Sequence, residues 1–159
     1  MPINERLQVL LDESGVEYEI IHHQDDFRAV TTAEDTHTPA REFAKAVFLW
    51  IDGSYAMATL PATHFVAESK LARSLGAENV RLAFESEMQD LCPDCEVGAA
   101  PPFGTLYGLP VYASPVLARD DHVTFNAGTH RDAVRMAYKD FERLVKPRIL
   151  PLSRHEDEG

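Results

Sequence analysis

The feature that most restricts the fold is an almost wholly apolar run followed at once by a turn and a second strand-like run. Residues 43–51 read Phe-Ala-Lys-Ala-Val-Phe-Leu-Trp-Ile, and residues 55–60 read Tyr-Ala-Met-Ala-Thr-Leu. Asp52-Gly53 between them is a dipeptide that favours the tight turn of a β-hairpin. A strand that is apolar on both faces has to be covered on both, so residues 43–51 are predicted to form a central strand.

Lys45 is the one charged residue in that strand. A buried lysine without a partner costs several kcal/mol, so its ammonium group must either reach solvent along the side chain or face an anion in a cleft. The residues alone leave both interpretations open.

Hydrophobic spacing and capping residues predict the other elements. Helices are expected over 4–14, 31–37, 67–75, 84–91 and 139–145, and strands over 17–22, 79–83, 109–113, 122–126 and 133–137. Helices separated by short strands and hairpins predict an α+β fold with a mixed, partly rolled β-sheet and flanking helices. We expect residues 1–150 to form a single domain and residues 151–159 a polar, flexible tail.

Composition excludes several classes of protein. The 159 residues are 45% hydrophobic, enough for one core, and contain no apolar run of about 18 residues or signal-like N-terminus. We therefore expect a cytoplasmic protein with no membrane partner. A formal charge of -11 argues against a general nucleic-acid coat protein and against DNA binding.

The charge is uneven along the chain. Residues 128–149 hold six basic side chains against three acidic ones. Such a segment is typical of a solvated helix face, and it is also where a local RNA contact would form. The basic residues are Arg131, Arg135, Lys139, Arg143, Lys146 and Arg148.

Cys92 and Cys95 are too few and too close together for a disulfide framework, and no second ligand pair at zinc-finger spacing accompanies them. We expect reduced thiols, assign no metal ligand and no cofactor, and leave the role of the two cysteines open. Nucleophile-elbow, P-loop and dinucleotide-binding motifs are also missing from the sequence, which disfavours covalent catalysis and nucleotide use.

Two loops stand out instead. Residues 97–104 read Val-Gly-Ala-Ala-Pro-Pro-Phe-Gly, a stiff segment with permissive ends. Residues 126–130 read Asn-Ala-Gly-Thr-His, a glycine-centred turn between two expected strands. On its own, His130 in that turn is more typical of a surface imidazole than of a catalytic residue.

Taken in order, these segments resemble the YbaK/ProX family, the free-standing relatives of the editing domain of bacterial prolyl-tRNA synthetases. The resemblance covers almost the whole chain. It rests on residues 22–23, 31–34, 42–45, 59–62, 70–72, 94–104, 109–112, 125–130 and 138–141.

The resemblance implies a cleft for the aminoacylated 3′ end of tRNA and hydrolysis of the ester of a mismatched small amino acid, such as alanine or cysteine on a proline tRNA. A synthetase partner is left open. The resemblance implies catalytic roles at Lys45, Gly98, Pro101, Pro102, Gly104, Gly128 and His130, and substrate contacts at Ala46, Phe103, Asn126, Thr129 and Arg131.

The sequence departs from the family at Ala46, where members often carry a small polar residue. This departure bears on the choice of amino acid rather than on the reaction. An aminoacyl ester is already activated, so a fixed water molecule and an oxyanion site suffice for its hydrolysis. Two alternatives are a non-catalytic tRNA- or protein-binding module of the same fold and a hydrolase of another small acyl ester.

Overall fold

The structure, a computed structural model, describes residues 3–23 and 41–155, and the helix expected over 31–37 lies outside these ranges. The helices are α1 (Glu5–Ser14), α3 (Glu68–Leu75), α4 (Glu85–Leu91) and α5 (Tyr138–Val145), with 3₁₀ turns η1 (Gly104–Tyr107) and η2 (Leu117–Arg119). The strands are β1 (Tyr18–His22), β2 (Phe43–Ile51), β3 (Ser54–Pro61), β4 (His64–Val66), β5 (Val80–Leu82), β6 (Val111–Ala113), β7 (His122–Asn126), β8 (Asp132–Ala137), β9 (Arg148–Ile149) and β10 (Ser153–His155).

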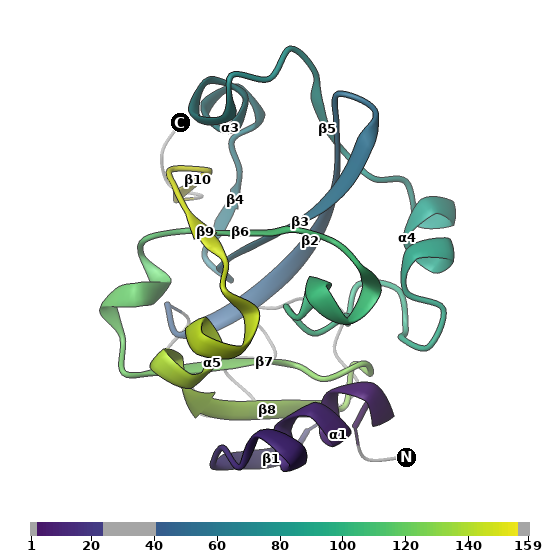
Figure 1. The fold of residues 1–159 in the computed structure, drawn as a ribbon, viewed down its shortest axis with the longest axis vertical. Coiled ribbons are helices and arrows are strands. Elements are labelled where there is room, and N and C mark those ends of the chain that lie inside the picture. The colour runs from purple at the N-terminus through teal and green to yellow at the C-terminus, as the bar shows by residue number, and fades with distance from the viewer. Residues whose placement is uncertain (1–2, 24–40, 156–159) are drawn as a thin grey trace.

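Most of these strands form one mixed sheet (Figure 1). Its order is β1-β8-β7-β2-β3-β6-β9, and β5 pairs with β2 off this path. The β2–β7, β3–β6 and β6–β9 pairs are parallel, and the other pairs are antiparallel. The α+β class with a mixed sheet and flanking helices is therefore confirmed.

The predicted hairpin is confirmed, and β2 is the central strand. Asp52 and Gly53 both have positive φ, 46° and 95°, as the tight turn between β2 and β3 requires. One edge of β2 pairs with β3 along its length, and the other edge is shared by β7 near Phe43 and β5 near Leu49.

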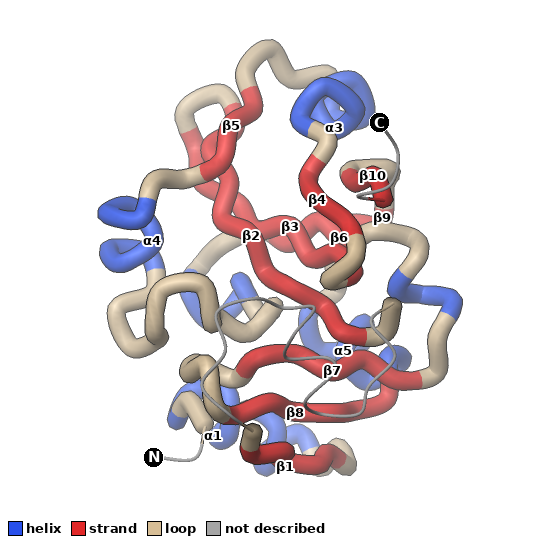
Figure 2. The backbone as a smooth tube through the Cα atoms, turned by 180° about the vertical axis from the view of Figure 1, so that it is seen from behind, coloured by secondary structure: helices blue, strands red, loops and turns tan. Residues whose placement is uncertain are grey.

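Two cores cover opposite faces of β2. Phe48 belongs to the larger cluster and the adjacent Leu49 to a second one, so consecutive side chains are buried on opposite sides. Helices α1 and α5 lie on the same face of β1, β8 and β7, where Leu11 and Phe141 are fully buried (Figures 1 and 2). Helix α3 inserts Leu71 into the second cluster at the other end of the sheet.

The C-terminal segment differs from the expected flexible tail. Leu152 is fully buried, and Ser153–His155 form β10, which pairs with β4. His64 lies in β4, and its Nδ1 is 2.8 Å from the Ser153 hydroxyl oxygen. A strand of three residues is too short to show the alternation of apolar and polar residues that predicts a strand. β4 and β10 form because each supplies the hydrogen-bonding partner of the other.

Within residues 3–23 and 41–155, the structure contains no helix with the length and apolar character that a membrane span requires.

A half-buried charge cluster attaches α4 to the sheet. The Glu87 carboxylate accepts hydrogen bonds from Arg81 at 2.8 Å, from the Phe84 N–H at 2.8 Å and from the Tyr55 hydroxyl. The Arg81 guanidinium lies over the Phe84 ring at 4.6 Å from its centre. The hydrogen bond from Arg81, followed by those from Phe84 and Tyr55, lowers the pKa of Glu87 to about 2.

This cluster predicts an acid-sensitive contribution to stability. A carboxylate whose pKa falls on folding stabilises the protein above its unfolded pKa, and that contribution is lost as the pH falls through the folded value. Glu87→Gln should therefore melt at a lower temperature than the wild type at pH 7, with a gap that shrinks from about pH 5 towards pH 2.

Glu85→Gln in the same helix is the matched control, since no ion pair involves it within the described residues. A gap between wild type and Glu87→Gln that stays constant from pH 7 to pH 2 would contradict the assignment.

Candidate functional site

Two segments far apart in the sequence are hydrogen-bonded to each other. Residues 96–103 belong to the connection between α4 and η1, and residues 127–131 connect β7 to β8. The Gly128 N–H donates to the Ala99 carbonyl oxygen at 2.9 Å, and the Glu96 N–H donates to the Gly128 carbonyl oxygen at 2.8 Å. The two loops predicted to carry the site therefore lie side by side.

His130 connects the same two segments through its side chain and backbone. Its N–H donates to Glu96 Oε1 at 2.7 Å, and its Nε2 lies 2.8 Å from the Val97 carbonyl oxygen. A carbonyl only accepts, so Nε2 carries the proton. The side chain is 3% exposed, which makes the interpretation as a surface imidazole wrong.

The Val97–Gly98 peptide is oriented by this contact. In a trans peptide the C=O and N–H point in opposite directions, and no described peptide is cis. Because the Val97 carbonyl faces the imidazole, the Gly98 N–H faces away from it. Gly98 is exposed, and its N–H has no acceptor among the described residues. Gly98 also has φ +84°, and a Cβ there would lie 3.5 Å from His130 Cε1.

The turn has its own internal support. The Thr129 hydroxyl donates to Asp132 Oδ2 at 2.7 Å and accepts from the Asp132 N–H at 3.1 Å. Asp132 is 5% exposed, and its Oδ1 lies 2.5 Å from His22 Nδ1. Thr129, expected to contact substrate, is thus engaged in holding the turn.

Lys45 lies on the strand next to this turn. Phe43 and Ala44 pair in parallel with Thr124 and Phe125, so the register places Asn126 level with Lys45 on the same face of the sheet. Both side chains are half-buried. Thr124 Oγ1 and Asn126 Oδ1 are buried atoms on this face, and neither has a hydrogen-bond partner within the described residues.

Ala46 and Arg131 are placed differently. The half-buried side chain of Ala46 points to the opposite face from Lys45, where it packs on the larger core. Arg131 is exposed immediately after His130.

Four of the expected site residues belong to the core instead. Pro101 and Pro102 are buried. Phe103 is fully buried between the rings of Phe125 and Phe141, each 5.5 Å away, so it offers no surface to a substrate. A Cβ on Gly104 would lie 2.9 Å from Val111 Cγ2, so this glycine permits close packing.

Three residues that support the candidate site have no distinctive signal in the sequence. Glu96 accepts from His130, Asp132 supports the turn, and the Asn4 N–H donates to the Ala127 carbonyl oxygen at 2.8 Å. Each is a common polar residue whose role depends on a partner distant in the chain.

One further group within the described residues, comprising Cys92, Asp94 and Cys95, has the atoms to hold a metal ion.

The fold is that of a known group of solved structures. A crystal structure assigned to trans-editing for prolyl-tRNA synthetase is 20% identical, covering 97% of this chain and 98% of that chain with a TM-score of 0.84. A crystal structure of a hypothetical protein is 14% identical, with a TM-score of 0.85 over 94% of this chain and 100% of that one. These likenesses define the fold class.

Comparison of the sequence identifies the family of the chain, whereas the structural likenesses show its fold. The model of the aminoacyl-tRNA editing domain matches residues 23–144, and the chain belongs to this family. The Multifunctional Ser/Thr-tRNA deacylase ProXp-y of Escherichia coli (strain K12) is 28% identical over 156 residues, covering 95% of this chain and 93% of that protein. The predicted family and its hydrolysis of aminoacyl-tRNA are thereby confirmed.

The close packing of the turn predicts that a substitution of Gly128 lowers the free energy of unfolding strongly. Its φ of +105° disfavours any side chain, and a Cβ would lie 2.9 Å from Asn4 Cβ. Gly128→Ala should therefore lower the free energy of unfolding by at least about 2 kcal/mol, since strain and a steric clash combine. Chemical denaturation measures this loss.

Gly53→Ala is the matched control, because Gly53 has φ +95° and no atom lies within 4 Å of the position that a Cβ would occupy there. It should lose only the strain component, about 1 kcal/mol. Equal losses in the two variants would show that the approach to Asn4 is unimportant.

Proposed function

We propose that the loop 96–99 and the turn 127–131 form the centre that hydrolyses the ester of mischarged aminoacyl-tRNA. The observation that carries the proposal is the hydrogen bond between His130 and the Val97 carbonyl oxygen, which turns the N–H of the exposed residue Gly98 away from the imidazole. A fixed backbone donor is the group that stabilises the oxyanion formed when water attacks an ester carbonyl.

In this proposal His130 is a positioning residue. Its Nε2–H is engaged with the Val97 carbonyl oxygen at 2.8 Å, so it orients the peptide that presents Gly98. Water adds to the ester carbon and loses a proton to solvent, and the Gly98 N–H binds the negatively charged oxygen that forms. Collapse of the intermediate breaks the bond to the ribose oxygen, which takes a proton from solvent and leaves as the hydroxyl, and the amino acid is released. Because the ester is activated, this arrangement requires no protein nucleophile.

Lys45 would bind the acceptor end. It extends from the central strand on the face that also carries Asn126, and the RNA terminus supplies phosphate groups. A charge-assisted contact of this kind is worth about 1.5–3 kcal/mol.

The amino acid removed is proposed to carry a hydroxyl group, serine or threonine. Thr124 Oγ1 and Asn126 Oδ1 are buried without partners among the described residues, so a polar substrate gains hydrogen bonds there that alanine cannot make. The deacylase relative from Escherichia coli is named for serine and threonine. Alanine or cysteine on a proline tRNA, implied by the YbaK/ProX resemblance, is the alternative. We also propose that the protein cooperates with an aminoacyl-tRNA synthetase.

A panel of mischarged tRNAs tests the function. Single-turnover deacylation of seryl-, threonyl-, alanyl- and cysteinyl-tRNA should proceed at least about fivefold faster for the hydroxyl amino acids, since a missing hydrogen bond to a buried group costs about 1 kcal/mol or more. Faster hydrolysis of alanyl- or cysteinyl-tRNA would favour the alternative specificity. No hydrolysis of any member would overturn the enzymatic function.

Two variants of Lys45 test its role in substrate binding in the same assay. Lys45→Met keeps an apolar stem and should lower kcat/KM at least about tenfold with an unchanged melting temperature. Lys45→Arg should retain more activity than Lys45→Met because the charge remains. Full activity in folded Lys45→Met would remove Lys45 from the binding of substrate.

The basic segment should contact the RNA beyond its 3′ end. Arg131 follows His130 directly, and Arg135 and Lys139 lie further along the segment, where they line a groove of about 570 Å³ together with Arg143 and the acidic residues Glu17, Glu19 and Asp140. Changing all three to Gln should weaken tRNA binding and flatten its salt dependence, by about 0.7–0.9 in logarithmic slope for each phosphate that is no longer neutralised.

A variant with equal charge loss on other elements controls for net charge. Arg73, Arg119 and Arg154 lie on α3, η2 and β10, outside the basic segment, and changing them to Gln should leave the slope close to that of the wild type. Equal slopes in the two triple variants would exclude a localised contact at the basic segment.

A further inference from the structure

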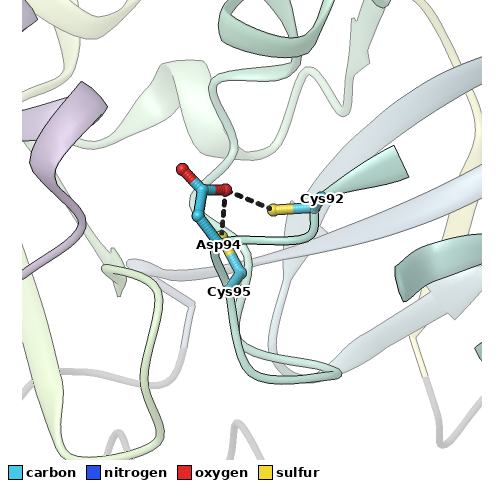
Figure 3. A group of neighbouring side chains, drawn as sticks. All are labelled: Cys92, Asp94 and Cys95. Carbon is cyan, nitrogen blue, oxygen red and sulfur yellow. Dashed lines mark hydrogen bonds between the residues drawn. The ribbon is translucent and has the colours of Figure 1, made fainter. Parts of the chain in front are cut away.

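The proposed hydrolysis makes no use of a compact polar cluster just before the Gly98 loop. Cys92 follows α4, and a turn in which the Cys95 N–H donates to the Cys92 carbonyl oxygen at 3.3 Å brings the two cysteines together. Figure 3 shows both thiols directed at the carboxylate of Asp94. Each sulfur lies 3.8 Å from the same oxygen, Oδ1.

The spacing of these three atoms matches a metal-binding set. The two sulfur atoms and a carboxylate oxygen all lie within 4.8 Å of one another, and both sulfur–oxygen distances are 3.8 Å. A point equidistant from all three atoms then lies at most about 2.5 Å from each, close to the lengths of Zn–S and Zn–O bonds. Two thiolates and a carboxylate form a donor set that Zn²⁺ accepts, with a water molecule as the fourth ligand.

Neighbouring side chains orient this set. The Tyr107 hydroxyl donates to Asp94 Oδ1 at 2.9 Å, and the Asn4 side-chain amide donates to Cys95 Sγ at 3.7 Å. Arg6 Nε lies 3.4 Å from Asp94 Oδ2, so the second carboxylate oxygen is engaged and Oδ1 is left to face the thiols. Outer partners of this kind fix the ligands of zinc sites.

The charges also balance. Two thiolates, one carboxylate and Zn²⁺ carry a net charge of -1, and the Arg6 guanidinium beside Asp94 offsets it. Cys92 is 3% exposed, whereas Asp94 is exposed, so an ion can enter from the solvent side.

We propose that Cys92, Asp94 and Cys95 bind one Zn²⁺ ion, with a water molecule as the fourth ligand. Zn–S bonds form at Cys92 and Cys95, the two S–H bonds break, and both protons pass to solvent. The ion would fix the turn that leads into Glu96, whose carboxylate accepts the His130 N–H. It would join α4, α1 and η1 at one point, because Asn4 and Tyr107 contact its ligands.

Binding is measured on the reduced, metal-free full chain. Titration with Cd²⁺, a spectroscopic substitute for Zn²⁺, should produce a thiolate-to-cadmium charge-transfer band that saturates at one equivalent, and Zn²⁺ should displace it. Cys92→Ser combined with Cys95→Ser should abolish the band. Asp94→Asn should weaken Zn²⁺ binding at least about tenfold, whereas Asp90→Asn at an exposed position of α4 should leave it unchanged.

A second measurement requires no variant and so does not depend on folding of the mutants. One equivalent of Zn²⁺ should protect both thiols of the wild type from a thiol-specific reagent, and Zn²⁺ at about a hundredfold excess over Kd should raise Tm by at least about 5 °C. Binding to histidines elsewhere would leave the thiols reactive. Reactive thiols in the presence of Zn²⁺, absence of the charge-transfer band, or unchanged binding by the double cysteine variant would each overturn the site.

Discussion

The arrangement of the candidate site depends on the hydrogen bonding between residues 96–99 and 128–130. Four contacts hold the two segments together, with donor–acceptor distances of 2.7–2.9 Å. Residues 96–99 form a loop outside the sheet and the helices, and their contacts with the turn define its conformation. The conformation of Gly98 therefore depends on a turn some thirty residues later in the chain.

The sheet supplies the fixed frame for this pair of loops. Strand β2 is buried on both faces and pairs with β7, the strand that leads into the turn. Helix α1 reaches the same turn from the other side, because the Asn4 N–H donates to the Ala127 carbonyl oxygen and its side chain caps the helix by accepting the Leu7 N–H. The turn is thus held by the sheet, the first helix and the loop together, which favours a preorganised site.

Much of this arrangement follows from local pattern. The Asp52-Gly53 hairpin and the apolar strand 43–51 each depend on residues that are close in the sequence, and both are found as expected. The adjacency of loop and turn was implied by family resemblance rather than by periodicity. Burial of Phe103 and the pairing of β10 with β4 could not be predicted locally, because both depend on partners brought in from distant segments.

The most direct test of the account is where a stable substrate mimic binds. An amide-linked seryl analogue of the tRNA 3′ end can be titrated into isotope-labelled protein while backbone amide signals are followed by NMR. The account predicts that the largest change occurs at the Gly98 N–H, accompanied by changes at residues 128–130. Saturating binding that leaves Gly98 and these residues unperturbed, with changes confined to another surface, would contradict it.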